Sequence, residues 1–212
     1  MRYWHGTPDE KSCKEITRTR SLRPLSEEEL IVKYTYGNIS TPRAGSVYVS
    51  KDPNYALIYA LGGNYAGSGV VPVHPSRHGC LFEIDVPASA DIVVDEDELG
   101  ELAANGKIPW LKKLGQDVAK GEVYSSEEGE DDEDLWVAAT RWGDYAAWIQ
   151  LGHLLHEVLS ASDMKRILPK AKNYAIRGPN RVVHAYRIDK KLISKMRKGD
   201  IQGTLAISER LF

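Results

Sequence analysis

The stretch that decides the fold is Arg2-Tyr3-Trp4-His5-Gly6-Thr7-Pro8. Its aromatic residues favour an extended strand, and its glycine and proline are typical of the turns in which strands end. We therefore expect a short strand here that ends in a turn at His5-Gly6-Thr7.

A second strand and a helix are predicted further along the chain. Residues 45–50, Gly-Ser-Val-Tyr-Val-Ser, have the composition of a short strand. Asp52-Pro53 follows, and this pair is typical of a helix N-cap with proline at the first helical position. The helix predicted over 54–61 carries Tyr55 and Tyr59 four residues apart, which places both rings on one helix face.

The rest of the chain mixes predicted strands and helices, with no internal repeat and no clear linker. This pattern predicts one domain of α+β type over residues 1–212, in which the region of about 87–134 resembles an acidic insertion. A glycine-rich loop is expected over 62–79. We expect further strands over 80–86 and 181–188 and helices over 95–104, 107–114, 135–149 and 163–168, while 153–159 fits either a helix or a strand.

The net charge of −2 conceals two oppositely charged regions. Residues 81–134 hold 17 acidic and 4 basic side chains, and 127–134 alone hold seven acids. The segment of about 165–212 holds 13 basic and 3 acidic side chains. The basic segment therefore suits a nucleic-acid or acidic partner, and the alternative is that both regions are ordinary solvated surface.

Composition excludes several classes of protein. Charged residues at 27% and hydrophobic residues at 42% exclude wholesale disorder. No apolar run approaches the ~20 residues that cross a bilayer, and no secretory signal is visible at the first residues. We therefore expect a cytoplasmic protein without a membrane partner, in which Cys13 and Cys80 are reduced thiols.

Histidines and a cysteine raise the possibility of a metal site. His74, His78 and Cys80 lie close in sequence, and His153 and His156 are a second pair at helical spacing. A structural zinc needs four ligands at orderly spacing, which neither group supplies. No metal is therefore expected.

Three segments of the chain form an ordered set. They are Tyr3-Trp4-His5-Gly6-Thr7, then Val47-Tyr48-Val49-Ser50 with Ala56 and Tyr59, and finally Glu157-Val158-Leu159 followed by Ile167. In this order they resemble the ADP-ribosyltransferase superfamily, specifically its His-Tyr-Glu branch of diphtheria-type toxins and poly(ADP-ribose) polymerases. The resemblance implies an α+β fold of split antiparallel β-sheets flanked by helices, in which the catalytic glutamate starts a strand.

The same resemblance implies an NAD-dependent mono-ADP-ribosyltransferase that modifies a protein or a nucleic acid and releases nicotinamide. NAD is then a consumed substrate and no metal takes part. The implied catalytic residues are Glu157, His5 and Tyr48. The implied NAD-binding residues are His5, Gly6, Thr7, Tyr48, Ser50 and Tyr59.

The chemistry of such a site explains these residue types. Cleavage of the nicotinamide–ribose bond builds positive charge on the ribose, as in glycoside hydrolysis, and a carboxylate at Glu157 would stabilise that charge. Tyr48 and Tyr59 would stack on the flat nicotinamide ring. His5 would bind a ribose hydroxyl, and Gly6 would let the backbone approach the carboxamide because it has no Cβ.

Several alternatives stay open. Leu155 stands where arginine-modifying relatives carry a second acidic or amide residue, so arginine is a doubtful acceptor. Glu83, and more distantly Glu209, become rival carboxylates if Glu157 lies inside a helix. The biological role, as a toxin, an effector, a defence factor or a housekeeping enzyme, is also open.

Two other functions compete with ADP-ribosyl transfer. An RNA 2'-phosphotransferase of the same fold would suit the basic segment, and Arg18, Arg20 and Arg43 would be its candidate phosphate ligands. A non-catalytic module that binds nucleic acid or an acidic protein is the other.

Overall fold

The computed structural model groups the chain into two compact units, whereas the sequence predicted one domain. The first unit comprises Met1–Pro24, Val47–Ile92 and Ile176–Phe212, and the second Leu25–Ser46 and Val93–Ala175. The structure describes residues 1–24, 26, 45–66, 69–72, 77–124, 133–189, 191 and 201–212.

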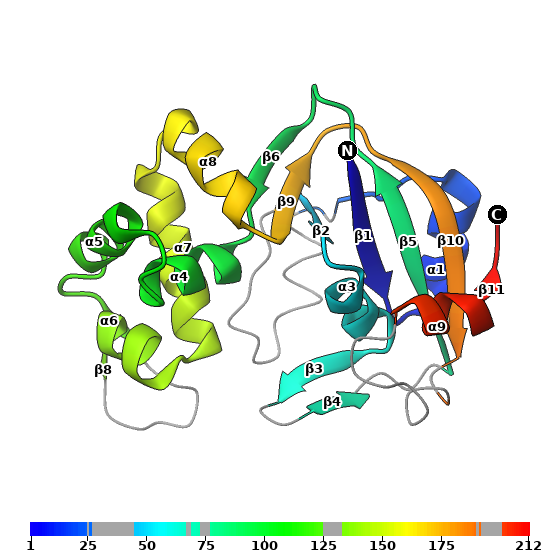
Figure 1. Cartoon of the computed structure of the whole chain (residues 1–212), viewed down its shortest axis with the longest axis horizontal. Coiled ribbons are helices and arrows are strands. Elements are labelled where there is room, and N and C mark those ends of the chain that lie inside the picture. The colour runs from blue at the N-terminus through cyan, green and yellow to red at the C-terminus, as the bar shows by residue number, and fades with distance from the viewer. Residues whose placement is uncertain are drawn as a thin grey trace. The chain divides into compact units, whose positions relative to one another are not determined.

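The first unit is built around a seven-stranded sheet whose strand order is β11-β10-β5-β1-β2-β9-β6. The pairs β1–β2, β1–β5, β5–β10 and β10–β11 are antiparallel, and β1, β5 and β10 lie side by side in Figure 1. The chain passes between the units within β6 and within β9. The strands are β1 (Arg2–Thr7), β2 (Val47–Ser50), β5 (His78–Asp85), β6 (Asp91–Val94), β9 (Asn173–Arg177), β10 (Arg181–Asp189) and β11 (Glu209–Arg210).

Helices α1 (Glu10–Thr19) and α3 (Pro53–Ala60) cover opposite faces of this sheet. A Cβ at Gly79 of β5 would lie 1.6 Å from the Ala60 carbonyl oxygen, so the backbone of α3 rests on that face. Cys80, the next residue of β5, is bonded to Cys13 of α1. Because successive strand residues point to opposite faces, α1 lies on the other side.

The core on the α3 side is a cluster of small and branched apolar residues. Short helix residues let α3 approach the sheet closely, and the aromatic side chains Trp4 and Tyr186 close the edges of the cluster. Helix α9 (Ile201–Ile207) contributes Ile201 and Leu205 to the same cluster. The buried members are Ala56, Leu57, Ala60, Leu61, Leu81, Ile188 and Ile201.

The described part of the second unit is mainly helical. Helices α4 and α7 pack with their backbones in contact, because Cβ atoms at Gly100 and Gly152 would lie 1.9 Å from carbonyl oxygens of the other helix. Its helices are α4 (Glu96–Ala104), α5 (Pro109–Val118), α6 (Leu135–Val137), a π-helix (Ala138–Trp142), α7 (Tyr145–Val158), α8 (Ala161–Ile167) and a 3-10 turn (Leu168–Lys170), and β7 (Val123–Tyr124) pairs with β8 (Glu133–Asp134).

The structure confirms the α+β class, with an antiparallel sheet flanked by helices. It also confirms the strands predicted over 45–50, 80–86 and 181–188 and the helix predicted over 54–61, where Asp52 caps α3 and Pro53 stands at its first position. The loop predicted over 62–79 is wrong, because β3 (Gly63–Ala66) and β4 (Gly69–Pro72) form a hairpin within it.

The prediction of reduced cysteines is also wrong. Cys13 and Cys80 form a disulfide whose Cα atoms are 5.7 Å apart, although 67 residues separate them in the chain. The sequence argument failed because it treated two cysteines as too few for a disulfide framework, while the fold itself brings α1 onto β5.

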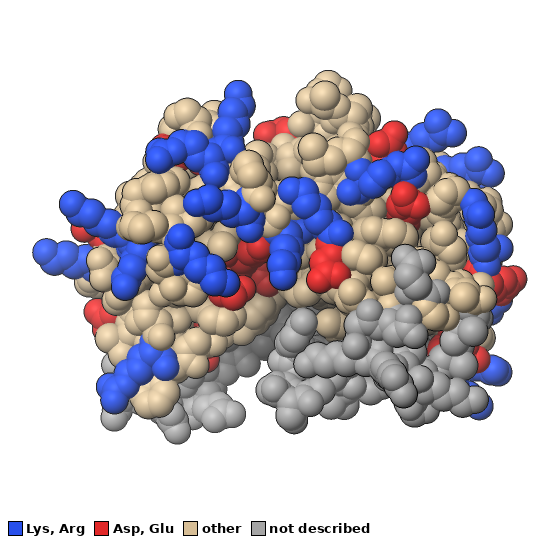
Figure 2. Space-filling view, viewed as in Figure 1, with Lys and Arg blue, Asp and Glu red and all other residues tan. Residues whose placement is uncertain are grey.

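Acidic and basic side chains are less separated in space than the two oppositely charged regions of the sequence suggest. On the face shown in Figure 2, acidic side chains lie among the lysines and arginines that the structure describes. Of the tract 127–134, only Glu133 and Asp134 are within the described residues. Two bases of the C-terminal segment form ion pairs: Arg187 with Glu10 and Glu209, and Arg166 with Asp163.

Gly6→Ala should destabilise the first unit by about 3 kcal/mol or more, because overpacking a rigid contact is costly. The added Cβ would lie 1.9 Å from the Ala56 carbonyl oxygen and 2.6 Å from the Ala60 nitrogen, both backbone atoms of α3. Urea unfolding measures the change. Gly121→Ala is the control: its φ of +84° costs only about 1–2 kcal/mol, and nothing lies within 4 Å. Equal losses in the two variants would contradict the packing role of Gly6.

Candidate functional site

His5 lies near the end of β1 and is held by the backbone of β2. Its Nδ1 atom lies 2.8 Å from the carbonyl oxygen of Tyr48. A carbonyl oxygen only accepts hydrogen bonds, so Nδ1 carries the hydrogen and donates it. In the neutral ring Nε2 then carries the lone pair. This bond therefore fixes the orientation of the His5 ring and makes Nε2 its acceptor nitrogen in the neutral form.

The predicted site residues divide between the two faces of the sheet. Trp4 of β1 stands opposite Ser50 of β2, and this antiparallel register places Tyr48 opposite Gly6. By strand alternation, Tyr48 and Ser50 belong to the face that α3 covers, whereas His5 belongs to the face that α1 covers. The structure thus joins the His5 ring to the backbone of Tyr48, with the two side chains assigned to opposite faces.

Gly6, Thr7 and Ser50 each have a structural task. Gly6 leaves room for the α3 backbone. The side chain of Thr7 is buried opposite Cys80. The Ser50 hydroxyl accepts a hydrogen bond from the backbone N–H of Asp52 at 3.0 Å and so shapes the entry into α3. The close contact with α3 is enough to explain why residue 6 is a glycine, and no bound ligand is needed to explain it.

Tyr59 is exposed on the outer side of α3, with 42% of its surface accessible. Its ring packs edge-on against Tyr55 at a centroid distance of 5.4 Å, and the two hydroxyl groups lie 3.2 Å apart. The predicted placement of both rings on one helix face is confirmed. Tyr59 therefore presents aromatic surface to solvent, while Tyr55 is half-buried.

The expectation that Glu157 starts a strand is wrong. Glu157 is exposed near the end of α7 in the second unit, not buried in an apolar strand. Its apolar neighbours misled the sequence argument because such neighbours fit a helix as well as a strand. The spacing of Ala147, Leu151 and Leu155, all buried on α7, was the signal for the helix.

The rival carboxylates are held by basic partners. Glu83 of β5 accepts a hydrogen bond from the Arg2 guanidinium at 2.8 Å and lies 3.9 Å from the His184 ring. Its register opposite Trp4 places it on the α3 face, away from His5. Glu209 on β11 pairs with Arg187. Both therefore have clear structural roles in cross-strand ion pairs.

Other residues that the sequence suggested as phosphate or metal ligands have structural contacts instead. Arg20 ends α1 in the left-handed region at φ 55°, and its guanidinium stacks on the Phe212 ring at 4.6 Å. His156 bonds the Val94 carbonyl oxygen at 2.8 Å, and Cys80 is in the disulfide. His74 and Arg43 lie outside the described residues. Among the described side chains, no three His, Cys, Asp or Glu residues are placed to hold a metal ion.

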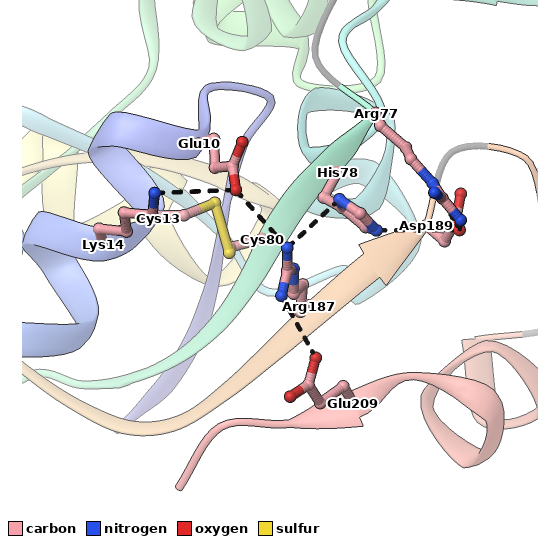
Figure 3. Close-up of polar contacts among 9 residues, drawn as sticks. All are labelled: Glu10, Cys13, Lys14, Arg77, His78, Cys80, Arg187, Asp189 and Glu209. Atoms are coloured by element: carbon pink, nitrogen blue, oxygen red, sulfur yellow. Dashed lines mark hydrogen bonds and ion pairs between the residues drawn. A yellow bond between two sulfur atoms is a disulfide. The ribbon is translucent and has the colours of Figure 1, made fainter.

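The sequence argument missed a polar cluster around Arg187 (Figure 3). The Arg187 guanidinium reaches Glu10 at 3.5 Å, Glu209 at 3.6 Å and the Nδ1 atom of His78 at 3.4 Å. Arg187 stands opposite Cys80 in the sheet, so the cluster lies beside the disulfide. No spacing signal predicts it, because its members come from four separate elements.

A second polar cluster begins helix α4. Glu96, Asp97 and Glu98 are buried there. Glu98 accepts hydrogen bonds from the backbone N–H groups of Lys172 at 2.6 Å and Asn173 at 2.5 Å. Desolvation raises the pKa of Asp95 well above its usual range, and the Asp97 and Glu96 carboxylates raise it further. Burial and the neighbouring carboxylates therefore both favour the protonated form of Asp95.

No family model, no curated protein and no solved structure matches this chain. No helix among the described residues is both long and apolar enough to cross a membrane.

Asp95→Asn should make the protein more stable at pH 7. The raised pKa means that the folded chain holds a proton that the unfolded chain releases above about pH 4, so this contribution to stability falls as pH rises. Asparagine cannot ionise and still suits the N-cap position. Thermal unfolding between pH 4 and 7 should show a smaller loss of stability with rising pH in the variant. Asp117→Asn, at an exposed residue of α5, is the control, and identical pH profiles for Asp95→Asn and the original chain would contradict the raised pKa.

Proposed function

We propose that the chain is an NAD-consuming ADP-ribosyltransferase whose donor site includes His5. The observation that carries the proposal is the hydrogen bond from His5 Nδ1 to the Tyr48 carbonyl oxygen at 2.8 Å. It links the two segments on which the sequence resemblance rests most strongly, and it turns His5 into an acceptor for a ribose hydroxyl. The antiparallel sheet flanked by helices is also of the expected class.

The proposed reaction replaces one bond at C1′ of the nicotinamide ribose. The bond from C1′ to the nicotinamide nitrogen breaks, and nitrogen keeps the electron pair, so that nicotinamide leaves as a neutral molecule. Positive charge develops on the ribose as the bond lengthens. An oxygen or nitrogen of the acceptor, a protein or a nucleic acid, then bonds to C1′ and releases its proton.

Two groups of the chain are assigned to this reaction. His5 would fix the ribose by accepting a hydrogen bond from one hydroxyl. Tyr59, which the sequence resemblance also assigns to NAD, lies on α3 at the face of the sheet opposite to His5, so it takes no part in this site. Glu157 would be the carboxylate that stabilises the developing charge. Its assignment rests on the sequence resemblance alone, because it belongs to the second unit, and it is tested separately below.

Labelled NAD distinguishes the competing functions. The chain is incubated with NAD labelled in the adenylate phosphate and with a cell lysate, with and without nuclease, while released nicotinamide is quantified. Label in protein or in nucleic acid, with equimolar nicotinamide, supports ADP-ribosyl transfer. Nicotinamide release that requires a 2'-phosphorylated RNA would support the phosphotransferase. Nucleic-acid binding that weakens steeply with salt, without nicotinamide release, would support a binding module.

His5→Asn should lower nicotinamide release by about 100-fold, as the loss of one oriented active-site hydrogen bond does elsewhere. The asparagine amide can donate to the Tyr48 carbonyl oxygen from nearly the position of Nδ1, but it places no acceptor at the position of Nε2. Its stability should therefore stay close to that of the original chain. His5→Ala loses both groups and should also lose about 1 kcal/mol of stability. Full activity in His5→Asn would remove His5 from the donor site.

Glu157→Gln should abolish transfer while thermal unfolding stays unchanged, because Glu157 is exposed and its replacement disturbs no core contact. Asp117→Asn, which also removes one exposed carboxylate from a helix of the second unit, is the matched control and should keep full activity. Undiminished transfer in Glu157→Gln would exclude this glutamate as the catalytic carboxylate.

A further inference from the structure

The Cys13–Cys80 disulfide is attached directly to the end of β1. Cys80 stands opposite Thr7 in the β1–β5 ladder, and Cys13 lies in the first turns of α1. Pro8 and Asp9 are the only residues between β1 and α1. Residues 7–13 therefore form a short segment, from the end of β1 to the beginning of α1, that is held to β5 at both ends: by strand pairing at Thr7 and by the disulfide at Cys13.

Weaker contacts hold α1 at the same place. Arg187 reaches Glu10 of α1 at 3.5 Å, and both side chains are partly exposed, at 37% and 47%. Figure 3 shows the two beside the disulfide. Exposed ion pairs of this kind contribute little to stability. The disulfide therefore adds a covalent restraint on the beginning of α1 that is stronger than this ion pair.

The end of β1 is also the place of the candidate donor site. His5 shares its sheet face with Thr7 and Cys80. Gly6 supports the backbone of α3, the helix that carries Tyr59. Only two residues separate α1 from β1, so a change in the position of α1 displaces the strand end that carries His5.

We propose that Cys13–Cys80 is a redox latch on the end of β1: the disulfide state orders the strand end for NAD binding, and the dithiol state releases it. The link to NAD rests on the proposed function, whereas the latch itself is a property of the fold. This inference gives the disulfide a regulatory role in addition to a stabilising one.

The switching step needs a dithiol reductant. One thiolate of the reductant attacks a sulfur of the Cys13–Cys80 bond and forms a mixed disulfide, and the other sulfur leaves and takes up a proton. The second thiol of the reductant then closes its own disulfide and frees the remaining cysteine as a thiol. Two electrons and two protons pass to the protein in all. Cys13 and Cys80 are 5% and 1% exposed, so the attack requires a local opening of α1.

Hydrogen–deuterium exchange of the full chain tests the latch independently of NAD. The air-oxidised chain is compared with the chain reduced by dithiothreitol, after thiol titration shows zero and two free thiols. Reduction should speed amide exchange at least tenfold in residues 5–19 and leave α7 of the second unit unchanged. Two free thiols in the air-oxidised chain, or unchanged exchange over 5–19 after full reduction, would overturn the proposal.

Nicotinamide release under the same two conditions tests the regulatory part. Reduction should raise the KM for NAD about tenfold in the original chain. Cys13→Ala should show the high KM with or without dithiothreitol, which excludes an effect of the reductant itself. Faster exchange without any NAD turnover in either state would sustain the latch and reject the proposed reaction. Equal KM values in the two states of an active chain would reject the latch as a regulator.

Discussion

The first unit depends on the close contact between the backbone of α3 and the two glycines beneath it. At Gly6 and Gly79 the helix backbone occupies the space where a Cβ would stand. Because the helix is so near, the small residues Ala56 and Ala60 suffice to fill the interface. The contact fixes α3 on neighbouring strands β1 and β5, and so sets the place of the Tyr55–Tyr59 pair relative to the strand that carries His5.

The sequence predicted correctly those helices and strands that are determined by neighbouring residues. Asp52 and Pro53 predicted α3 because capping and the fixed φ of proline act on adjacent residues. The aromatic residues of β1 predicted a strand because their preference for extended backbone is also local. The overall α+β class followed from several such signals taken together.

The features that sequence reasoning missed depend on distant parts of the chain. The disulfide forms because β5 brings Cys80 under α1, and no spacing predicts that meeting. Glu157 lies in a helix because α7 packs its buried face, which includes Leu151, on α4, whereas its own neighbours fit either structure. The division of His5 and Tyr48 between two faces follows from the register Trp4–Ser50, which a single sequence does not reveal.

The strand order of the first unit also governs when the unit can form during synthesis. Strand β1 is synthesised before its neighbour β5, which lies at His78–Asp85, and well before the next strand, β10, at Arg181–Asp189. Strands that pair over such sequence distances fold slowly, because the entropy of closing a long loop is lost before the stabilising contacts form. Most of the second unit, in contrast, is one continuous run from Val93 to Ala175. The aromatic strand that bears His5 therefore lacks its full sheet until β10 and β11 have been synthesised, and until then the far edge of its neighbour β5 stays unpaired.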